Sequence, residues 1–170
     1  MGFIADHLSN PLLTEGKRAI ILRKPGIRGL IVGVRERFGT AGEAFLYYNG
    51  FEIGMTGGKS HLGMAAELVV KDPARVFNVV SADLFSSIGY GVMEPLKVSA
   101  EPPYALVRVR NSFECEVAPK TGKAFSQMVR GMIAGVFSAL FGTRMAVEEV
   151  KCLAKRDAYC EFEAKPEAKT

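Results

Sequence analysis

The residues from Ala105 to Val117, ALVRVRNSFECEV, alternate between apolar and polar side chains. A period of two sends successive side chains to opposite faces of a strand. The side chains expected on the packed face are Val107, Val109, Phe113, Cys115 and Val117, and those expected on the solvated face are Arg108, Arg110, Ser112, Glu114 and Glu116. This pattern predicts a sheet that is packed on one side and wet on the other, as antiparallel sheets commonly are.

The rest of the chain divides into helical and extended segments. Residues 17–23 form a short β-like run, and helical patterns cover residues 27–39, 42–54, 72–91 and 119–142. Further extended segments cover residues 92–101, and residues 144–154 with 158–164 form a closing hairpin. Gly39 is a stop signal, and Asp72 with Pro73 is a helix start. We therefore predict an α+β fold with an antiparallel sheet and helices packed on one face.

Length and composition suit one domain with a substantial core. The chain has 170 residues, of which 48% are hydrophobic. We expect an N-terminal leader at 1–17, a domain at 18–164 and a polar tail at 165–170. The longest apolar stretch, residues 132–141, is shorter than the ~20 residues that a membrane span needs. Since no signal peptide is visible either, we expect a cytoplasmic protein without a membrane span.

Charge and motifs favour a binding module over an enzyme. The net charge is +4, and its excess lies in a basic stretch between Glu15 and Phe38. No aromatic residues interleave with these charges as a base-stacking surface needs, so direct nucleic-acid binding is not expected. The two histidines, His7 and His61, have no catalytic-type residue near them in sequence, and the standard phosphate, dinucleotide and hydrolase motifs are missing.

The closing hairpin holds two of the three cysteines, Cys152 and Cys160. A turn about Arg156 pairs them on neighbouring strands, with Cβ atoms ~4.5–5.5 Å apart. That spacing suits a disulfide, a pair of metal-binding thiolates, or two buried core side chains. Cys115 is a candidate third ligand and Glu148 or Glu149 a fourth. In an ideal strand Glu148 shares the face of Cys152, whereas Glu149 needs a bulge or a strand end to turn inward.

The segment RMAVEEVKCLAKRDAYCEFEA resembles the end of the 4-vinyl reductase (vinyl-4-reductase) domain family. The resemblance rests on Glu149, Cys152, the turn at Arg156-Asp157, and Cys160-Glu161-Phe162. Other pieces follow in the family's order: YYNGFEIG with Gly50 and Gly54, IGYG, VRNSFE, and RGMIAGVFSALFG. Together they span roughly Arg18 to Ala164.

This resemblance implies a fold related to the nitric-oxide-signalling and Golgi-transport ligand-binding domains. It also implies a homodimer that senses a small apolar or aromatic molecule and acts through a separate regulatory partner. It further implies a structural zinc ion held by three cysteines and a glutamate. The metal candidates are therefore Cys115, Glu149, Cys152 and Cys160, with Glu149 carried over from the motif against the ideal-strand argument.

Two departures from the family pattern leave the metal site open. The family's Gly-Asp turn is Arg156-Asp157 in this chain. The family's first zinc cysteine opens the long helix, near Phe125 or Ser126, where this chain has none. Either Cys115 takes that place from the preceding strand, or the site has three protein ligands, or it binds no metal.

An apolar ligand pocket is expected between the helices and the sheet. Its candidate lining residues, chosen by inward periodicity, are Tyr47, Tyr48, Phe51, Phe113, Met132 and Val147. Two other functions compete with a sensor. One is an enzyme or accessory protein in tetrapyrrole vinyl reduction, which needs a reductant site that no motif indicates. The other is a scaffold or assembly subunit.

Overall fold

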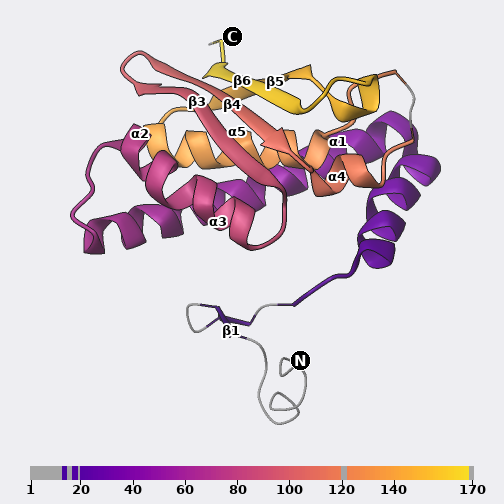
Figure 1. Ribbon diagram of the computed structural model, residues 1–170, viewed down its shortest axis with the longest axis horizontal. Coiled ribbons are helices and arrows are strands. Elements are labelled where there is room, and N and C mark those ends of the chain that lie inside the picture. Colours follow the sequence, from indigo (N-terminus) through magenta and orange to yellow (C-terminus); the bar gives the residue numbers. More distant parts are fainter. Residues whose placement is uncertain (1–12, 15–16, 19, 120–121, 169–170) are drawn as a thin grey trace.

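The computed structural model describes residues 13–14, 17–18, 20–119 and 122–168. Four strands form an antiparallel sheet in the order β3–β4–β6–β5. Their bounds are β3 Val92–Ala100, β4 Pro103–Arg110, β5 Met145–Lys151 and β6 Cys160–Pro166. Two short strands, β1 Leu13–Thr14 and β2 Lys17–Arg18, pair with each other. In Figure 1 the large sheet is the upper layer and the helices lie beneath it.

The helical elements surround one long helix, α5, which packs against both α1 and β5. The bounds are α1 Lys24–Glu67, α2 Pro73–Val76, α3 Ala82–Ser87, α4 Phe113–Glu116 and α5 Gln127–Phe141, with a π-helical turn η1 at Phe77–Ser81 and a 3₁₀ turn η2 at Leu153–Lys155. The predicted α+β class, with helices on one face of an antiparallel sheet, is confirmed.

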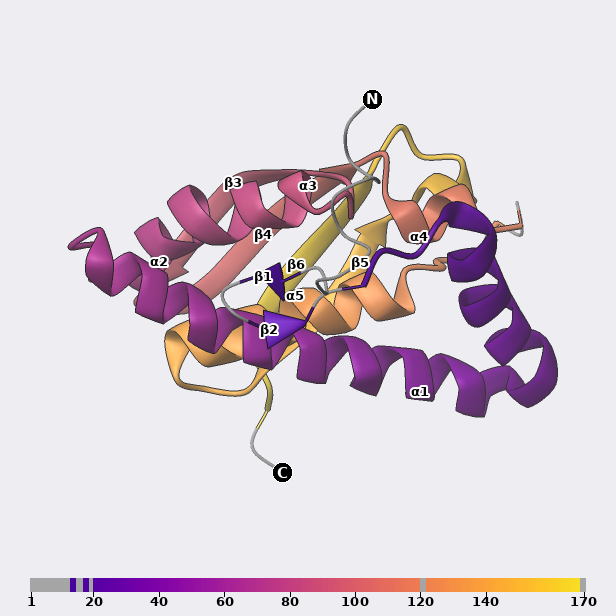
Figure 2. The ribbon, with the colours of Figure 1, turned by 90° about the horizontal axis from the view of Figure 1, so that it is seen from below.

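Helix α1 is broken at Gly39, the predicted stop signal. Gly39 has φ 53° and ψ −127°, a backbone conformation that side chains with a Cβ rarely adopt. The chain changes direction there and then continues as a helix (Figure 2). We call residues 24–38, before the break, the arm.

The remainder of α1 runs parallel to α5 in unusually close contact. Gly50 lies against Met128 and Gly54 against Met132, so both helices advance together. A Cβ added to Gly54 would lie 2.8 Å from the carbonyl carbon of Met132 and 2.9 Å from its Cα. The two backbones touch because glycine presents no side chain at this contact, which explains the glycines spaced four apart.

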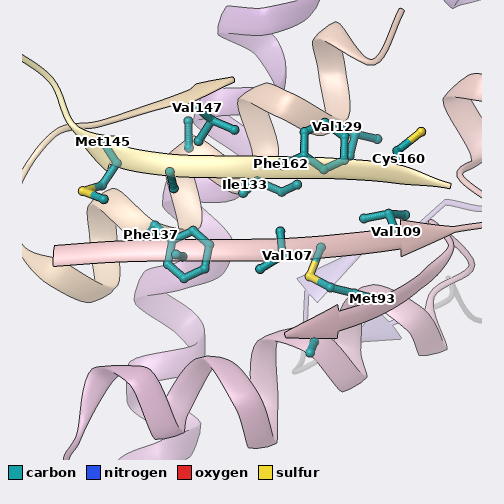
Figure 3. Packing of buried hydrophobic residues seen from close by; sticks show 14 of the residues in the cluster. Met93, Val107, Val109, Val129, Ile133, Phe137, Met145, Val147, Cys160 and Phe162 are labelled. Atoms are coloured by element: carbon teal, nitrogen blue, oxygen red, sulfur yellow. The ribbon is translucent and has the colours of Figure 1, made fainter. Parts of the chain in front are cut away.

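The core lies between the sheet and α5. Figure 3 shows Val107 and Val109 of β4 on the same side as Ile133 and Phe137 of α5. All four are at most 2% exposed. The ring of Phe137 stacks on Phe77 of η1 at a centroid distance of 4.3 Å. The alternation predicted for β4 is therefore confirmed for its valines.

The segment from α2 to β3 also follows the sequence pattern. The carboxylate of Asp72 accepts hydrogen bonds from the backbone N–H groups of Ala74 (3.3 Å) and Arg75 (3.2 Å), as an N-cap does. Gly89 and Gly91, with φ of 87° and 134°, end the helical run before β3. The helix start and stop predicted here are both confirmed.

The predicted strand over 105–117 is wrong beyond Arg110. Asn111 takes a left-handed conformation with φ 51°, which asparagine tolerates better than most residues. This residue ends β4, and residues 113–116 form the helical turn α4 instead. A helical turn does not preserve the period of two, so Glu114, predicted on the solvated face, is fully buried.

Two other boundaries also differ from the sequence prediction. The long helix starts at Gln127 rather than near residue 119, because Gly122 has φ 72° and Ser126 is non-helical. It has 15 residues, about four turns rather than five. In the β-like run at 17–23 only Lys17–Arg18 form a strand, and Ile20–Leu22 are exposed. The predicted leader lies mostly outside the described residues.

Candidate metal centre and apolar cavity

A β-bulge in the closing hairpin turns Glu149 toward the cysteines. Glu149 pairs with Phe162 and Lys151 with Glu161, so the strand gains one residue at Val150. This is the irregularity that an inward Glu149 requires. Beyond the bulge the register agrees with the predicted pairing of Cys152 and Cys160. The hairpin thereby presents a carboxylate and two thiols to one point.

The four predicted metal ligands lie together. The ligand atoms of Cys115, Glu149, Cys152 and Cys160 are all within 4.8 Å of one another. The Sγ atom of Cys115 is 3.6 Å from that of Cys152 and 3.4 Å from that of Cys160. A disulfide needs about 2.05 Å, so these are free thiols.

Cys115 reaches the cluster from α4, not from the strand on which the sequence pattern put it. It is half-buried, whereas Cys152 and Cys160 are fully buried. Its Sγ also lies 3.2 Å from the Oγ of Ser126. Of the alternatives left open by the sequence, the geometry supports Cys115 as the spatial substitute for a cysteine at the start of α5.

Ser126 holds the carboxylate of Glu149. Its backbone N–H donates to Oε2 at 3.0 Å, and its hydroxyl donates to Oε1 at 2.6 Å. Ser126 is 1% exposed and was not among the predicted site residues. Its position at the opening of the long helix, where the family has a cysteine, was the signal that could have identified it. A ligating carboxylate is commonly fixed by such a hydrogen-bonding neighbour.

The protonation of the cluster follows from its shared hydrogen bonds. Hydrogen bonds from the thiols of Cys115 and Cys160 lower the pKa of Cys152 below its ordinary value. The same Cys115–Cys152 bond, aided by burial, raises the pKa of Cys115 to about 12. The pKa of Cys160 is also raised by its bonds to Cys115 and Cys152, and burial raises the pKa of Glu149 to about 7. The cluster thus prefers one thiolate among thiols, whose protons a bound cation would displace.

The donor set fits a divalent soft metal ion. Tetrahedral thiolates at about 2.3 Å from one zinc ion lie roughly 3.8 Å apart, close to the sulfur–sulfur distances in this cluster. The carboxylate supplies a fourth donor. The four residues are therefore close enough together to hold a metal ion.

The turn between the cluster cysteines depends on Arg156. Arg156 has φ 75°, the left-handed conformation for which the family uses glycine. Asp157 of the same turn accepts a hydrogen bond from the backbone N–H of Cys152 at 2.8 Å. The Arg156-Asp157 pair therefore makes the turn despite its departure from Gly-Asp.

A separate apolar cavity lies between α1, η1, α3 and α5. It has a volume of about 110 Å³. Its walls include Phe77, Leu84, Phe85, Met132, Ile133 and Val136. Ile53 and Ile88 line it and are themselves 40% and 59% exposed, so the cavity reaches the surface between α1 and α3.

Polar side chains in the cavity wall gather at one place. The Nδ1 atom of His61 and the Oγ atom of Ser81 are 2.9 Å apart, and both residues line the cavity. The wall also contains Tyr90, whose pKa is raised by burial. The cavity is thus apolar with a few polar groups, the arrangement common in small-molecule sites.

Of the six predicted pocket residues, Met132 lines this cavity. Phe113 lies behind the wall, its ring 5.2 Å from that of Tyr90. Phe51 and Val147 are buried elsewhere, and Tyr47 and Tyr48 line an open groove beside Arg130. Sequence periodicity identified inward side chains but could not distinguish a filled core from a cavity. The apolar stripe from Phe77 to Ile88 was the signal for most of the wall.

Membrane insertion has no support within the residues that the structure describes. Among them, no helix combines the length and the apolar character that crossing a bilayer requires.

Comparison with known proteins identifies a domain in the second half of the chain. Residues 106–166 match the model of the vinyl-4-reductase domain. An uncharacterized protein of Methanocaldococcus jannaschii is 28% identical over 88 residues, which are 52% of this chain and 50% of that protein. The alignment therefore spans about half the length of that relative.

Several solved structures share the fold. The phenol-responsive sensory domain of the transcription activator PoxR, solved with phenol, has a TM-score of 0.77 at 19% identity, covering 89% of this chain and 78% of that one. Trafficking protein particle complex subunit 3 from Naegleria fowleri, covalently bound to palmitic acid, has a TM-score of 0.60 at 14% identity, covering 84% and 92%. A vinyl-4-reductase family protein of M. jannaschii has a TM-score of 0.52 at 17% identity, covering 89% and 100%.

These likenesses confirm the expected relationship to ligand-binding sensor and transport-complex folds. The bulged hairpin with its glutamate and two cysteines lies inside the matched segment. The resemblance predicted from the closing segment is therefore confirmed, and residues 106–166 of this chain belong to the vinyl-4-reductase domain family.

Proposed function

We propose that this chain is a sensor domain that binds a small apolar or aromatic molecule, with a structural zinc ion at the hairpin. The observation that carries the proposal is the apolar cavity of about 110 Å³ that opens between α1 and α3. An apolar cavity of roughly 150 Å³ is enough to take up benzene, so this space suits a single ring or a short alkyl chain.

The polar pair in the wall supports a ligand with one hydroxyl group. Burying a hydroxyl without a hydrogen bond is costly, and His61 and Ser81 supply nitrogen and oxygen atoms at the cavity wall. The similar fold of the PoxR sensory domain, solved with phenol, supports the same ligand class. We therefore propose a phenol-like molecule as the ligand.

Zinc is proposed for the cluster because three thiolates and one carboxylate are ligands that it accepts. Cys115, Glu149, Cys152 and Cys160 would hold it, and Ser126 would orient the carboxylate. A closed set of four protein donors supplies folding stability rather than a catalytic position. The ion would join α4 to both strands of the closing hairpin.

Ligand binding is tested with phenol and toluene, which are similar in size and differ in the hydroxyl group. Calorimetric titration should show binding of phenol, with toluene weaker. Replacing Val136 by phenylalanine fills the cavity and should weaken binding by more than about tenfold, or about 1.4 kcal/mol. Val79→Phe, at a 43% exposed position of η1, is the matched control and should bind as the wild type does. Equal affinity in the Val136→Phe variant would contradict the proposed site.

The homodimer and the separate regulatory partner implied by the resemblance belong to the same proposal. Phe45 and Tyr48 lie three residues apart on α1 and are 57% and 58% exposed, which supports a contact between two copies. Sedimentation velocity should give a dimer for the wild type and a monomer for Phe45→Ser. Leu68→Ser, at a 63% exposed position beyond the end of α1, should stay dimeric. A wild-type monomer at micromolar concentration would refute the homodimer.

A further inference from the structure

The arm contacts the body at the two segments that carry Cys115 and Ser126. The Nη2 atom of Arg35 donates to the Oε1 atom of Glu114 at 2.9 Å and also to the backbone carbonyl of Phe125. The guanidinium group lies over the ring of Phe125, 3.8 Å from its centroid. Glu114 precedes Cys115 and Phe125 precedes Ser126, so one side chain of the arm touches both flanks of the metal cluster.

Further contacts of the arm fall on the same segment. The Nη1 atom of Arg28 donates to the carbonyl oxygen of Val117 at 3.4 Å, and Lys24 lies 3.3 Å from Glu116. The Lys24–Glu116 pair is more than half exposed on both sides, and such pairs contribute little. The buried contact through Arg35 therefore dominates the attachment of the arm.

Glu114 also connects this contact to α5. Its side chain is fully buried and accepts hydrogen bonds from the backbone N–H groups of Met128 (3.2 Å) and Val129 (2.9 Å). Burial raises the pKa of this carboxyl, while these N–H groups and Arg35 favour its charged form. Glu114 thus joins the arm, the segment that carries Cys115 and the first turn of α5.

The break itself does not fix the position of the arm. Gly39 has a left-handed φ, and a Cβ built there would meet no described atom within 4 Å. The backbone at Gly39 is therefore a hinge in open space. The orientation of the arm depends on its contacts with residues 114–117 and 125.

We propose that docking of the arm depends on metal loading of the cluster, with Arg35 and Glu114 as the positioning residues that connect the two. The inference rests on the proposed metal site. A bound ion ties Cys115 to the hairpin and so fixes α4, which carries the docking contacts of the arm. Without the ion, α4 keeps hydrogen bonds among thiols, and its hold on the arm weakens.

Hydrogen exchange of the intact wild-type chain tests this without any substitution. Exchange is compared between zinc-loaded protein and protein treated with a chelator. Amides of residues 24–38 should exchange faster in the stripped protein, whereas those of residues 46–58, which pack on α5, should change little. Typical couplings between two sites correspond to roughly 5–150-fold.

Reciprocity provides the second part of the test. If metal favours docking, docking must favour metal by the same factor. Arg35→Gln should therefore lower zinc affinity, measured by competition with a chromophoric chelator, and Arg35→Lys should restore part of it. Arg37→Gln, an exposed arginine two residues along the same arm, is the matched control and should bind zinc as the wild type does.

The outcomes separate the inference from the proposed function. A folded chain that binds no zinc overturns the metal site and the inference with it. A chain that binds zinc but shows equal exchange of residues 24–38 in both states overturns the inference alone. Unchanged zinc affinity in Arg35→Gln, with circular dichroism confirming the fold, would do the same.

Discussion

Gly54→Ala is expected to destabilise the protein by about 3 kcal/mol, the upper end of the usual cost of overpacking. The added methyl group would fall on the backbone carbonyl of Met132, with the carbonyl carbon at 2.8 Å and Cα at 2.9 Å. Backbone atoms cannot rotate away as a side chain can, so α1 and α5 must separate. At about 2–4 °C per kcal/mol for a chain of this size, the melting temperature should fall by roughly 6–12 °C.

Gly63→Ala is the matched control, because it makes the same substitution further along the same helix. Gly63 is exposed, and a Cβ there would meet no described atom within 4 Å. Alanine favours a helix over glycine by up to about 1 kcal/mol, so this variant should be neutral or slightly more stable. Calorimetry of both variants makes the comparison. Equal melting temperatures would mean that the helices do not touch at Gly54.

The close helix pair was predictable because glycine has a limited set of structural uses. Gly131 and Gly135, four apart in an apolar helix, indicate a close neighbour without naming it. The hairpin was predictable for a similar reason, because Met145 to Lys151 and Cys160 to Pro166 alternate and flank a turn. In both cases neighbouring residues supply the whole signal.

The parts that could not be predicted depend on distant partners. Glu114 follows an alternating pattern, and only Arg35 and the start of α5, far from it in sequence, explain why it is buried. The bulge at Val150 leaves no mark in the sequence, yet it decides whether Glu149 or Glu148 faces the cysteines. The cavity was missed because a residue lining a space and one filling a core have the same periodicity.

Cys152→Ser is expected to abolish metal binding and to remove the stability that the metal supplies. Cys152 is fully buried and contributes one of the three sulfur atoms, within 4.8 Å of every other donor. A ligand present at about 1,000 times its dissociation constant stabilises a folded protein by about 4 kcal/mol. Elemental analysis should find one zinc ion per wild-type chain and none in the variant. Chelation should lower the wild-type melting temperature by roughly 8–16 °C and leave the variant unchanged.

Two adjacent glutamates test the geometry of the site more sharply than a cysteine can. Glu149 is turned toward the cluster by the bulge and held by Ser126, whereas Glu148 is exposed on the same strand. Glu149→Gln removes the anionic donor with almost no change in shape, so zinc affinity should fall. Glu148→Gln makes the same change one residue away and should leave the affinity at the wild-type value. Equal loss in both variants would show that overall charge, and not the bulged geometry, governs binding. A metal-free wild-type chain with an unchanged melting temperature would show that the cysteines only fill the core.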